Sequence, residues 1–220
     1  MNDMPVYVRY IDLNGCKNSY CIPEKPNGYA LFMLLDYRLL TPDTAEQLIE
    51  TFVKKGYTVF SSNLLLAEWG SKKAVKHAEH LIQLLLRQET INERIFLCAE
   101  GTGALIAQQL FTKETIQIRA ATFIHPFLSL QDCLHAYKKD ELALKRFKKE
   151  MRSQYGISQL QPASLKAIDQ TLFAPCTLPV LHFSENEIVK DELKKELLSE
   201  QSRLFSEMSR FYQAFISRDR

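Results

Sequence analysis

Short apolar runs of strand length alternate along the chain with longer segments that are apolar on one helical face. The first two runs predict an antiparallel pair, and the later, almost continuously apolar runs predict buried strands. Thr41-Pro42 and Ser71 are typical helix starts. We expect strands at 6–11, 19–22, 29–35, 57–62, 95–98, 116–124 and 178–183, and helices at 42–55, 71–88, 104–109, most of 126–169, 189–200 and 208–217. This alternation predicts an α/β protein with a mainly parallel sheet covered by helices on both faces.

The segment Ala99-Glu-Gly-Thr-Gly103 has the form of a nucleophile elbow, the sharp strand-to-helix turn written G-x-S-x-G. Ala99 and Gly103 supply the small residues that let the backbone pack closely. An apolar strand precedes them and good helix formers follow. The central position, where serine is expected, is Gly101. The sequence therefore predicts the turn without its hydroxyl group.

Composition and charge narrow the function classes. The chain has 220 residues, 46% of them hydrophobic, which suits one domain over 1–220. A net charge of +2 does not indicate a nucleic-acid partner. No apolar run approaches the roughly 20 residues that span a bilayer, and residues 1–10 lack a secretory signal, so we expect a cytoplasmic protein. The five scattered cysteines predict reduced thiols.

No cofactor or metal is expected. The pair Gly101 and Gly103 lacks the third glycine of a dinucleotide loop, because Ile106 stands in its place. His77 and His80 lie one turn apart on a predicted helix that also carries three lysines. That pattern is typical of a solvated helix face rather than a metal site.

Two further segments resemble the α/β-hydrolase fold. Gly56-Tyr-Thr-Val-Phe-Ser-Ser-Asn63 is similar to the family pattern G-Y-x-V-x-x-x-D, and 178–189 is similar to the strand and loop that carry the catalytic acid. The resemblance covers about residues 5–217. It implies a sheet with a nucleophile elbow, a Ser-His-acid triad, and a helical lid, which here corresponds to the insert 126–177.

On this resemblance, the three triad positions fall on Gly101, Asn186 and Arg210. Arg210 follows a short last strand that we place at 202–206. Triad hydrolysis needs an attacking hydroxyl or thiol, an imidazole and an orienting carboxylate. We therefore expect a catalytically degenerate protein that acts by binding a small molecule or another protein.

An alternative is a hydrolase of esters or thioesters that uses Glu100 and His125. Ligands of open α/β sheets bind at the carboxyl ends of the strands, so the residues predicted there are the candidates for a pocket. They are Asp36, Tyr37, Asn63, Glu100, Thr102, His125 and Asn186.

The insert is locally basic over 138–152. Its cationic side chains are Lys138, Lys139, Lys145, Arg146, Lys148, Lys149 and Arg152. These cations are typical of a solvated helix face, and they also suit a surface that binds an anionic partner or acidic lipids. A purely structural subunit that docks through this insert is a third hypothesis.

Overall fold

The computed structural model describes residues 7–13, 16–36, 40–62, 69–157, 159–173, 178–183 and 193–217. Its strands form one seven-stranded sheet in the order β1-β2-β4-β3-β5-β6-β7. Strand β2 pairs antiparallel with β1 and with β4, whereas the remaining neighbours are parallel. The strands are β1 Tyr7–Leu13, β2 Cys16–Ile22, β3 Ala30–Leu34, β4 Thr58–Ser62, β5 Arg94–Glu100, β6 Gln117–Ile124 and β7 Val180–Phe183. The predicted mainly parallel sheet is confirmed.

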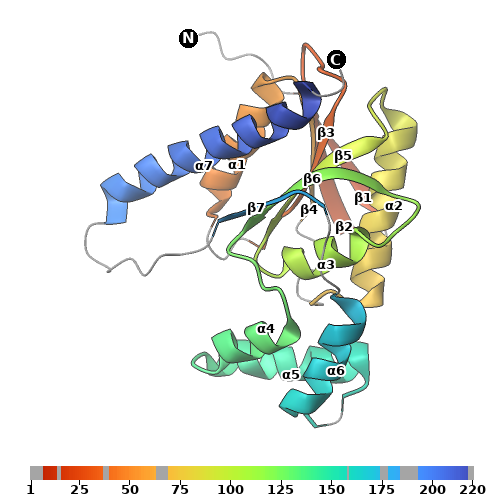
Figure 1. Ribbon diagram of the computed structural model, residues 1–220, viewed down its shortest axis with the longest axis vertical. Helices are drawn as coiled ribbons and strands as arrows, with labels where there is room; N and C mark the ends of the chain where they lie inside the picture. Colours follow the sequence, from red (N-terminus) through yellow and green to blue (C-terminus); the bar gives the residue numbers. More distant parts are fainter. Residues whose placement is uncertain are drawn as a thin grey trace.

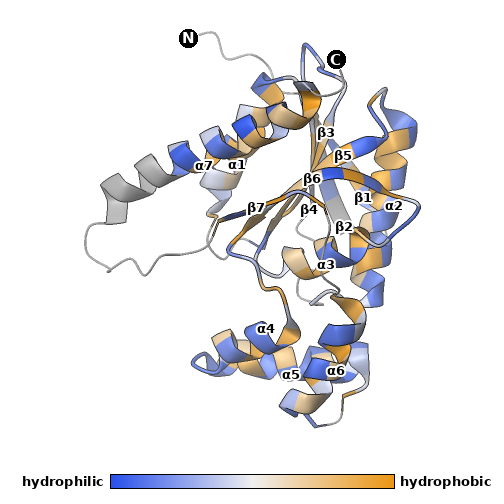
Figure 2. Cartoon of the chain, in the orientation of Figure 1, coloured by the Kyte–Doolittle hydropathy of each residue, from blue (hydrophilic) through white to orange (hydrophobic). Residues whose placement is uncertain are grey.

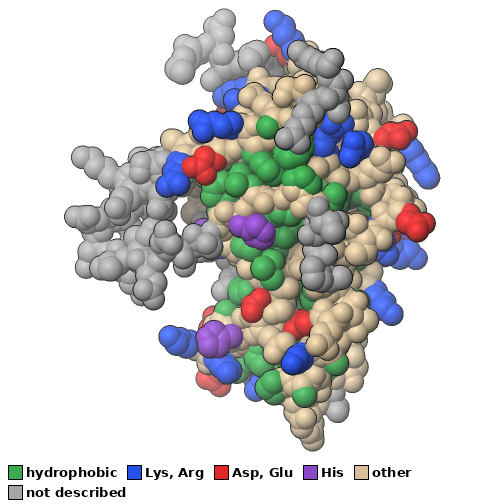
Figure 3. All heavy atoms as spheres, viewed as in Figure 1, with side chains coloured by type: hydrophobic (Ala, Val, Ile, Leu, Met, Phe, Trp, Pro, Cys, Tyr) green, Lys and Arg blue, Asp and Glu red, His purple; other side chains and the backbone are tan. Residues whose placement is uncertain are grey.

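Helices cover both faces of this sheet (Figure 1). Helices α1 (Pro42–Lys54) and α7 (Leu193–Ile216) lie on one face, where Phe52 and Tyr212 pack on Phe96 and its neighbours. Helices α2 (Lys72–Gln88) and α3 (Gly103–Leu110) lie on the other. Figure 2 shows hydrophobic residues along the central strands and both kinds of residue along α1, α2 and α7. Helices α1 and α2 are therefore amphipathic, whereas α3 is buried along almost its whole length. Figure 3 shows hydrophobic side chains gathered in the middle of this face of the molecule.

The predicted helix starts carry the expected side-chain caps. The Thr44 N–H donates to Thr41 Oγ1 at 3.2 Å at the start of α1. The Ala74 N–H donates to Ser71 Oγ at 3.3 Å at the start of α2. Each cap satisfies one backbone donor that has no partner within the helix. In the described part of the chain, no helix has both the length and the apolar character needed to cross a membrane.

The segment between β6 and β7 forms three helices beyond the carboxyl ends of the parallel strands (Figure 1). They are α4 Leu130–Tyr137, α5 Glu141–Tyr155 and α6 Pro162–Leu172. Trp69, from the segment before α2, is buried against Tyr137 and Phe147 and joins their cluster to Leu105 of α3. The Tyr155 hydroxyl donates to the Trp69 carbonyl at 2.7 Å. One buried aromatic cluster therefore joins the insert to α3 and to the segment before α2.

The C-terminal prediction of two helices separated by a strand at 202–206 was wrong. Residues 193–216 form the single helix α7. Leu204, Phe205, Met208, Tyr212 and Phe215 recur at helical spacing and pack in the cluster beneath α7. Because this apolar stripe is continuous, one helix keeps it on the side of the sheet, with Met208 and Tyr212 fully buried and the other residues partly buried, whereas a strand would turn half of it to solvent. Strand β7 is consequently the last strand of the described sheet, at its edge.

Candidate functional site

The predicted strand, tight turn and helix of the elbow are confirmed. Strand β5 ends at Glu100 and α3 begins at Gly103. Gly101 between them has φ +55°, a left-handed conformation that glycine adopts without steric cost. Its N–H donates to the Ile124 carbonyl at 3.1 Å, and its carbonyl accepts from the Phe127 N–H at 3.0 Å. The turn is thus bonded to the last residue of β6 and to the segment that follows it.

The two glycines of the turn are packed too closely to carry side chains. A Cβ atom on Gly103 would overlap the Leu34 carbonyl oxygen and lie 3.0 Å from Leu34 Cβ. A Cβ atom on Gly101 would overlap Asp36 Oδ2 and lie 3.0 Å from Asp36 Cβ. Asp36 follows β3, whose Leu34 pairs with Ala99 of β5. The parallel register therefore brings Asp36 alongside Gly101.

The Asp36 carboxylate lies where a side chain at position 101 would begin. Asp36 Oδ2 accepts from the Thr102 N–H at 2.9 Å and from Thr102 Oγ1 at 2.8 Å. In an α/β-hydrolase elbow, the N–H of the residue after the nucleophile belongs to the oxyanion hole. Here that N–H is already bonded to a carboxylate. The sequence placed Asp36 and Thr102 near one another but did not predict this contact.

Glu100 and Cys98 are buried beneath the turn. Both are 0% exposed, and Glu100 Oε1 accepts from the Leu40 N–H at 2.9 Å. Burial raises the pKa of the Cys98 thiol, and the negative charge of Glu100 adds to this rise. Cys98 is therefore a protonated core thiol and not a reactive thiolate. Cys21, Cys98 and Cys133 are all free thiols.

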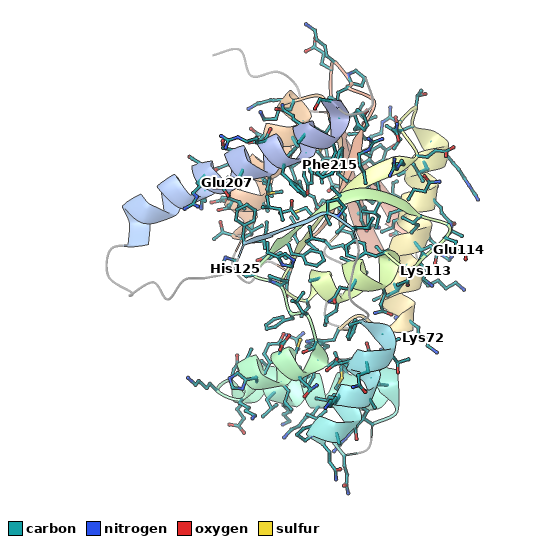
Figure 4. The ribbon with its side chains drawn as sticks, viewed as in Figure 1. Lys72, Lys113, Glu114, His125, Glu207 and Phe215 are labelled. Carbon is teal, nitrogen blue, oxygen red and sulfur yellow. The ribbon has the colours of Figure 1, made fainter. Side chains whose placement is uncertain are left out.

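His125 directly follows β6 and has an uncommon backbone conformation. Its φ is +43°, and its N–H donates to the Phe183 carbonyl of β7 at 2.7 Å. Figure 4 labels His125 at this end of the sheet, before the chain leaves toward α4. The side chain is half-buried. A non-glycine residue with positive φ is held there by its surroundings and is a candidate for a functional position. Sequence pattern alone gives no sign of this conformation.

Of the four remaining predicted site residues, the structure describes Arg210. Tyr37, Asn63 and Asn186 lie outside the described residues. Arg210 is exposed on α7, and the residues just before it, 202–206, are part of the same helix and not a strand. The alignment that placed Arg210 at the histidine position therefore loses the strand on which it depended. Among the described residues, no three His, Cys, Asp or Glu side chains gather as ligands for one metal ion.

A groove that the sequence analysis missed lies on the α2 and α3 side of the sheet. It has a volume of about 580 Å³ and runs along one face of α2, past the end of α3, to the end of α6. His80 of α2 lines it together with lysine side chains. Lys72, Lys76 and His80 follow one another at intervals of four residues and so share one face of α2, but the other wall comes from distant parts of the chain.

No family model matches the sequence, and no curated protein matches it. Solved structures do match. A carboxylesterase, Cest-2923 from Lactobacillus plantarum WCFS1, superimposes with a TM-score of 0.61 and 11% identity over 96% of this chain and 98% of that one. The chain has the α/β-hydrolase fold. The fluorophosphonate-binding serine hydrolase FphF of Staphylococcus aureus superimposes with a TM-score of 0.58 and 10% identity, covering 91% of this chain and 88% of that one.

The α/β-hydrolase fold is also shared with an esterase from the bacterial hormone-sensitive lipase family, with a TM-score of 0.52 and 14% identity over 81% of this chain. The chain spans 66% of the length of that esterase. At these identities, the likeness concerns the fold and not the activity. The fold predicted from the elbow and the two flanking segments is confirmed.

Proposed function

We propose that this chain is a non-hydrolytic protein of the α/β-hydrolase fold that acts by binding. The observation that carries this proposal is the Asp36 carboxylate beside Gly101, which accepts hydrogen bonds from Thr102 N and Oγ1 at 2.9 and 2.8 Å. A nucleophile at position 101 would need the space that this carboxylate fills.

Electrostatics also opposes acyl transfer at this turn. The oxyanion of a tetrahedral intermediate needs hydrogen-bond donors that are free to receive it. The Thr102 N–H is bonded to Asp36 instead. Two like charges about 4 Å apart repel by about 4 kcal/mol at the effective dielectric constant of a protein surface. The carboxylate would therefore raise the energy of an oxyanion formed here.

The alternative, hydrolysis by Glu100 and His125, has weaker support. Glu100 is 0% exposed and its carboxylate is bonded to the backbone of Leu40, so no substrate atom reaches it in this conformation. The half-buried His125 lies on the surface end of β6 and suits contact with a ligand or partner better than proton transfer to a buried acid.

The test is hydrolysis of p-nitrophenyl esters and acyl thioesters, from short to long chains, by the purified protein. We expect rates equal to those of buffer for the wild type. Glu100→Gln and His125→Gln are compared with matched controls, Glu93→Gln and His135→Gln, whose side chains are exposed away from the turn. Turnover that Glu100→Gln or His125→Gln abolishes and both controls retain would overturn the proposal. A carboxylesterase run in parallel verifies the assay.

A further inference from the structure

The groove between α2, α3 and α6 is built from three separate parts of the chain. One wall is a single face of α2, since Lys72, Val75, Lys76, Glu79 and Gln83 follow helical spacing. The other walls come from the end of α3 and the turn after it, and from the last residues of α6. These residues are Gln109, Thr112, Lys113, Thr171 and Leu172. Figure 4 shows Lys72 and Lys113 on the same side of the molecule, next to the upper end of α6.

Positive charge predominates in this groove. Lys72, Lys76 and Lys113 line it, opposed by the single carboxylate of Glu79. Glu79 is engaged locally: Lys113 Nζ lies 3.9 Å from its Oε2, and Thr115 Oγ1 donates to its Oε1 at 2.5 Å. Lys72 and Lys76 are exposed and make no ion pair with any residue that the structure describes. The groove therefore has a net charge of +2, which equals the net charge of the whole chain.

The groove also offers apolar surface beside these ammonium groups. Leu172 is half-buried and presents an apolar wall, and Val75, which is 3% exposed, adds a small apolar area. The Thr112 and Thr171 hydroxyls are already engaged, because they donate to the Gln109 and Ala167 carbonyls, so a phosphate in the groove depends on the ammonium groups. Lys72 is the first residue of α2, so the positive end of that helix dipole lies at this end of the groove.

We propose that this groove binds a small phosphomonoester, with the phosphate at Lys72, Lys76 and Lys113 and the organic part against Val75 and Leu172. A phosphate dianion matches the net charge, and lysine ammonium groups bind phosphate as compact point charges. A volume of about 580 Å³ is in the range of small-molecule sites. The inference deepens the proposed binding function and rests on it, because it assigns recognition without turnover to this groove.

The experiment is an NMR titration of the full chain, labelled with ¹⁵N, using phenyl phosphate as the probe. Lys72→Gln/Lys76→Gln is compared with Lys148→Gln/Lys149→Gln, a control that removes two exposed lysines from α5. We expect saturable shifts at residues of α2 and at 109–113 in the wild type and in the control. In Lys72→Gln/Lys76→Gln the Kd should rise at least about tenfold, because two of the three ammonium groups that attract the phosphate dianion are removed. Urea unfolding verifies that both variants are folded.

Parallel arms with succinate and phenol separate charge from apolar contact. Weaker binding of both than of phenyl phosphate supports the proposal, as does weakening of the phenyl phosphate complex at higher salt. Equal loss of affinity in the α5 control, tighter binding of succinate, or no saturable binding would overturn it. Ester turnover is measured separately. Hydrolysis with intact phenyl phosphate binding would overturn the proposed function alone, and absent binding without hydrolysis would overturn this inference alone.

Discussion

Replacing Gly101 by alanine should destabilise the fold far more than the same change at Gly156. Both glycines have positive φ, +55° and +67°, so alanine is strained at either position. They differ in their surroundings. A Cβ atom on Gly156 would meet nothing within 4 Å, whereas one on Gly101 would overlap the Asp36 carboxylate. The comparison therefore separates the cost of the backbone conformation from the cost of displacing Asp36.

The expected magnitudes follow from these contacts. Left-handed backbone costs alanine about 1–2 kcal/mol at both positions. At Gly101, the Asp36 side chain must also move and give up its bonds to Thr102 N and Oγ1. Hydrogen bonds to a charged group contribute about 1.5–3 kcal/mol each, part of which water recovers. We expect Gly101→Ala to lower the free energy of unfolding by about 3–5 kcal/mol and Gly156→Ala by about 1–2 kcal/mol.

Urea unfolding at 25 °C measures both values, with the slope m checked for constancy. Asp36→Ala completes a double-mutant cycle, because it removes the atom that the new Cβ would overlap. The cost of Asp36→Ala should be about 2 kcal/mol smaller in the Gly101→Ala background than in the wild type. Equal costs for Gly101→Ala and Gly156→Ala, with an additive cycle, would refute the close approach of Asp36 to Gly101.

Three further outcomes are expected. Asp169→Ala should lower the free energy of unfolding by about 2–3 kcal/mol in urea, because its buried carboxylate accepts from Leu130 N at 2.7 Å and from Gln131 N at 3.3 Å. The control Asp132→Ala removes an exposed carboxylate and should lower the free energy of unfolding by less than half as much. Burial raises the pKa of Cys21 from 9.0 to about 11. The unfolded thiol therefore ionises first, and the stability due to Cys21, complete below pH 9, is lost as pH rises toward 11. Over this pH interval, the free energy of unfolding of the wild type should fall by about 2 kcal/mol more than that of Cys21→Ala. Parallel profiles of unfolding free energy against pH would contradict this. Tyr212→Phe should cost about 1 kcal/mol, because the buried hydroxyl donates to Leu97 O at 2.8 Å, and an unchanged urea midpoint would argue against that bond.

The helix starts and the alternation of strands with helices along the chain were predictable because their causes are local. Thr41 and Ser71 cap their helices through hydroxyl groups three residues from the donors they satisfy. The small residues of the elbow were equally informative, since Gly103 has no room for a Cβ atom. In contrast, the strand at 202–206 was predicted from the family resemblance. These residues are helical because Phe205 and Met208 belong to one apolar stripe at helical spacing that packs toward the sheet.

The sequence by itself determined a parallel α/β sheet with a tight turn lacking a hydroxyl group at Gly101, because these features depend on short-range spacing and residue size. Only the tertiary structure decided what fills that turn. Asp36 and Gly101 meet because β3 pairs directly with β5, with Leu34 opposite Ala99. The groove likewise depends on how the end of α6 approaches α2. Contacts between such distant segments follow from strand order and packing of the whole chain, which no local pattern specifies.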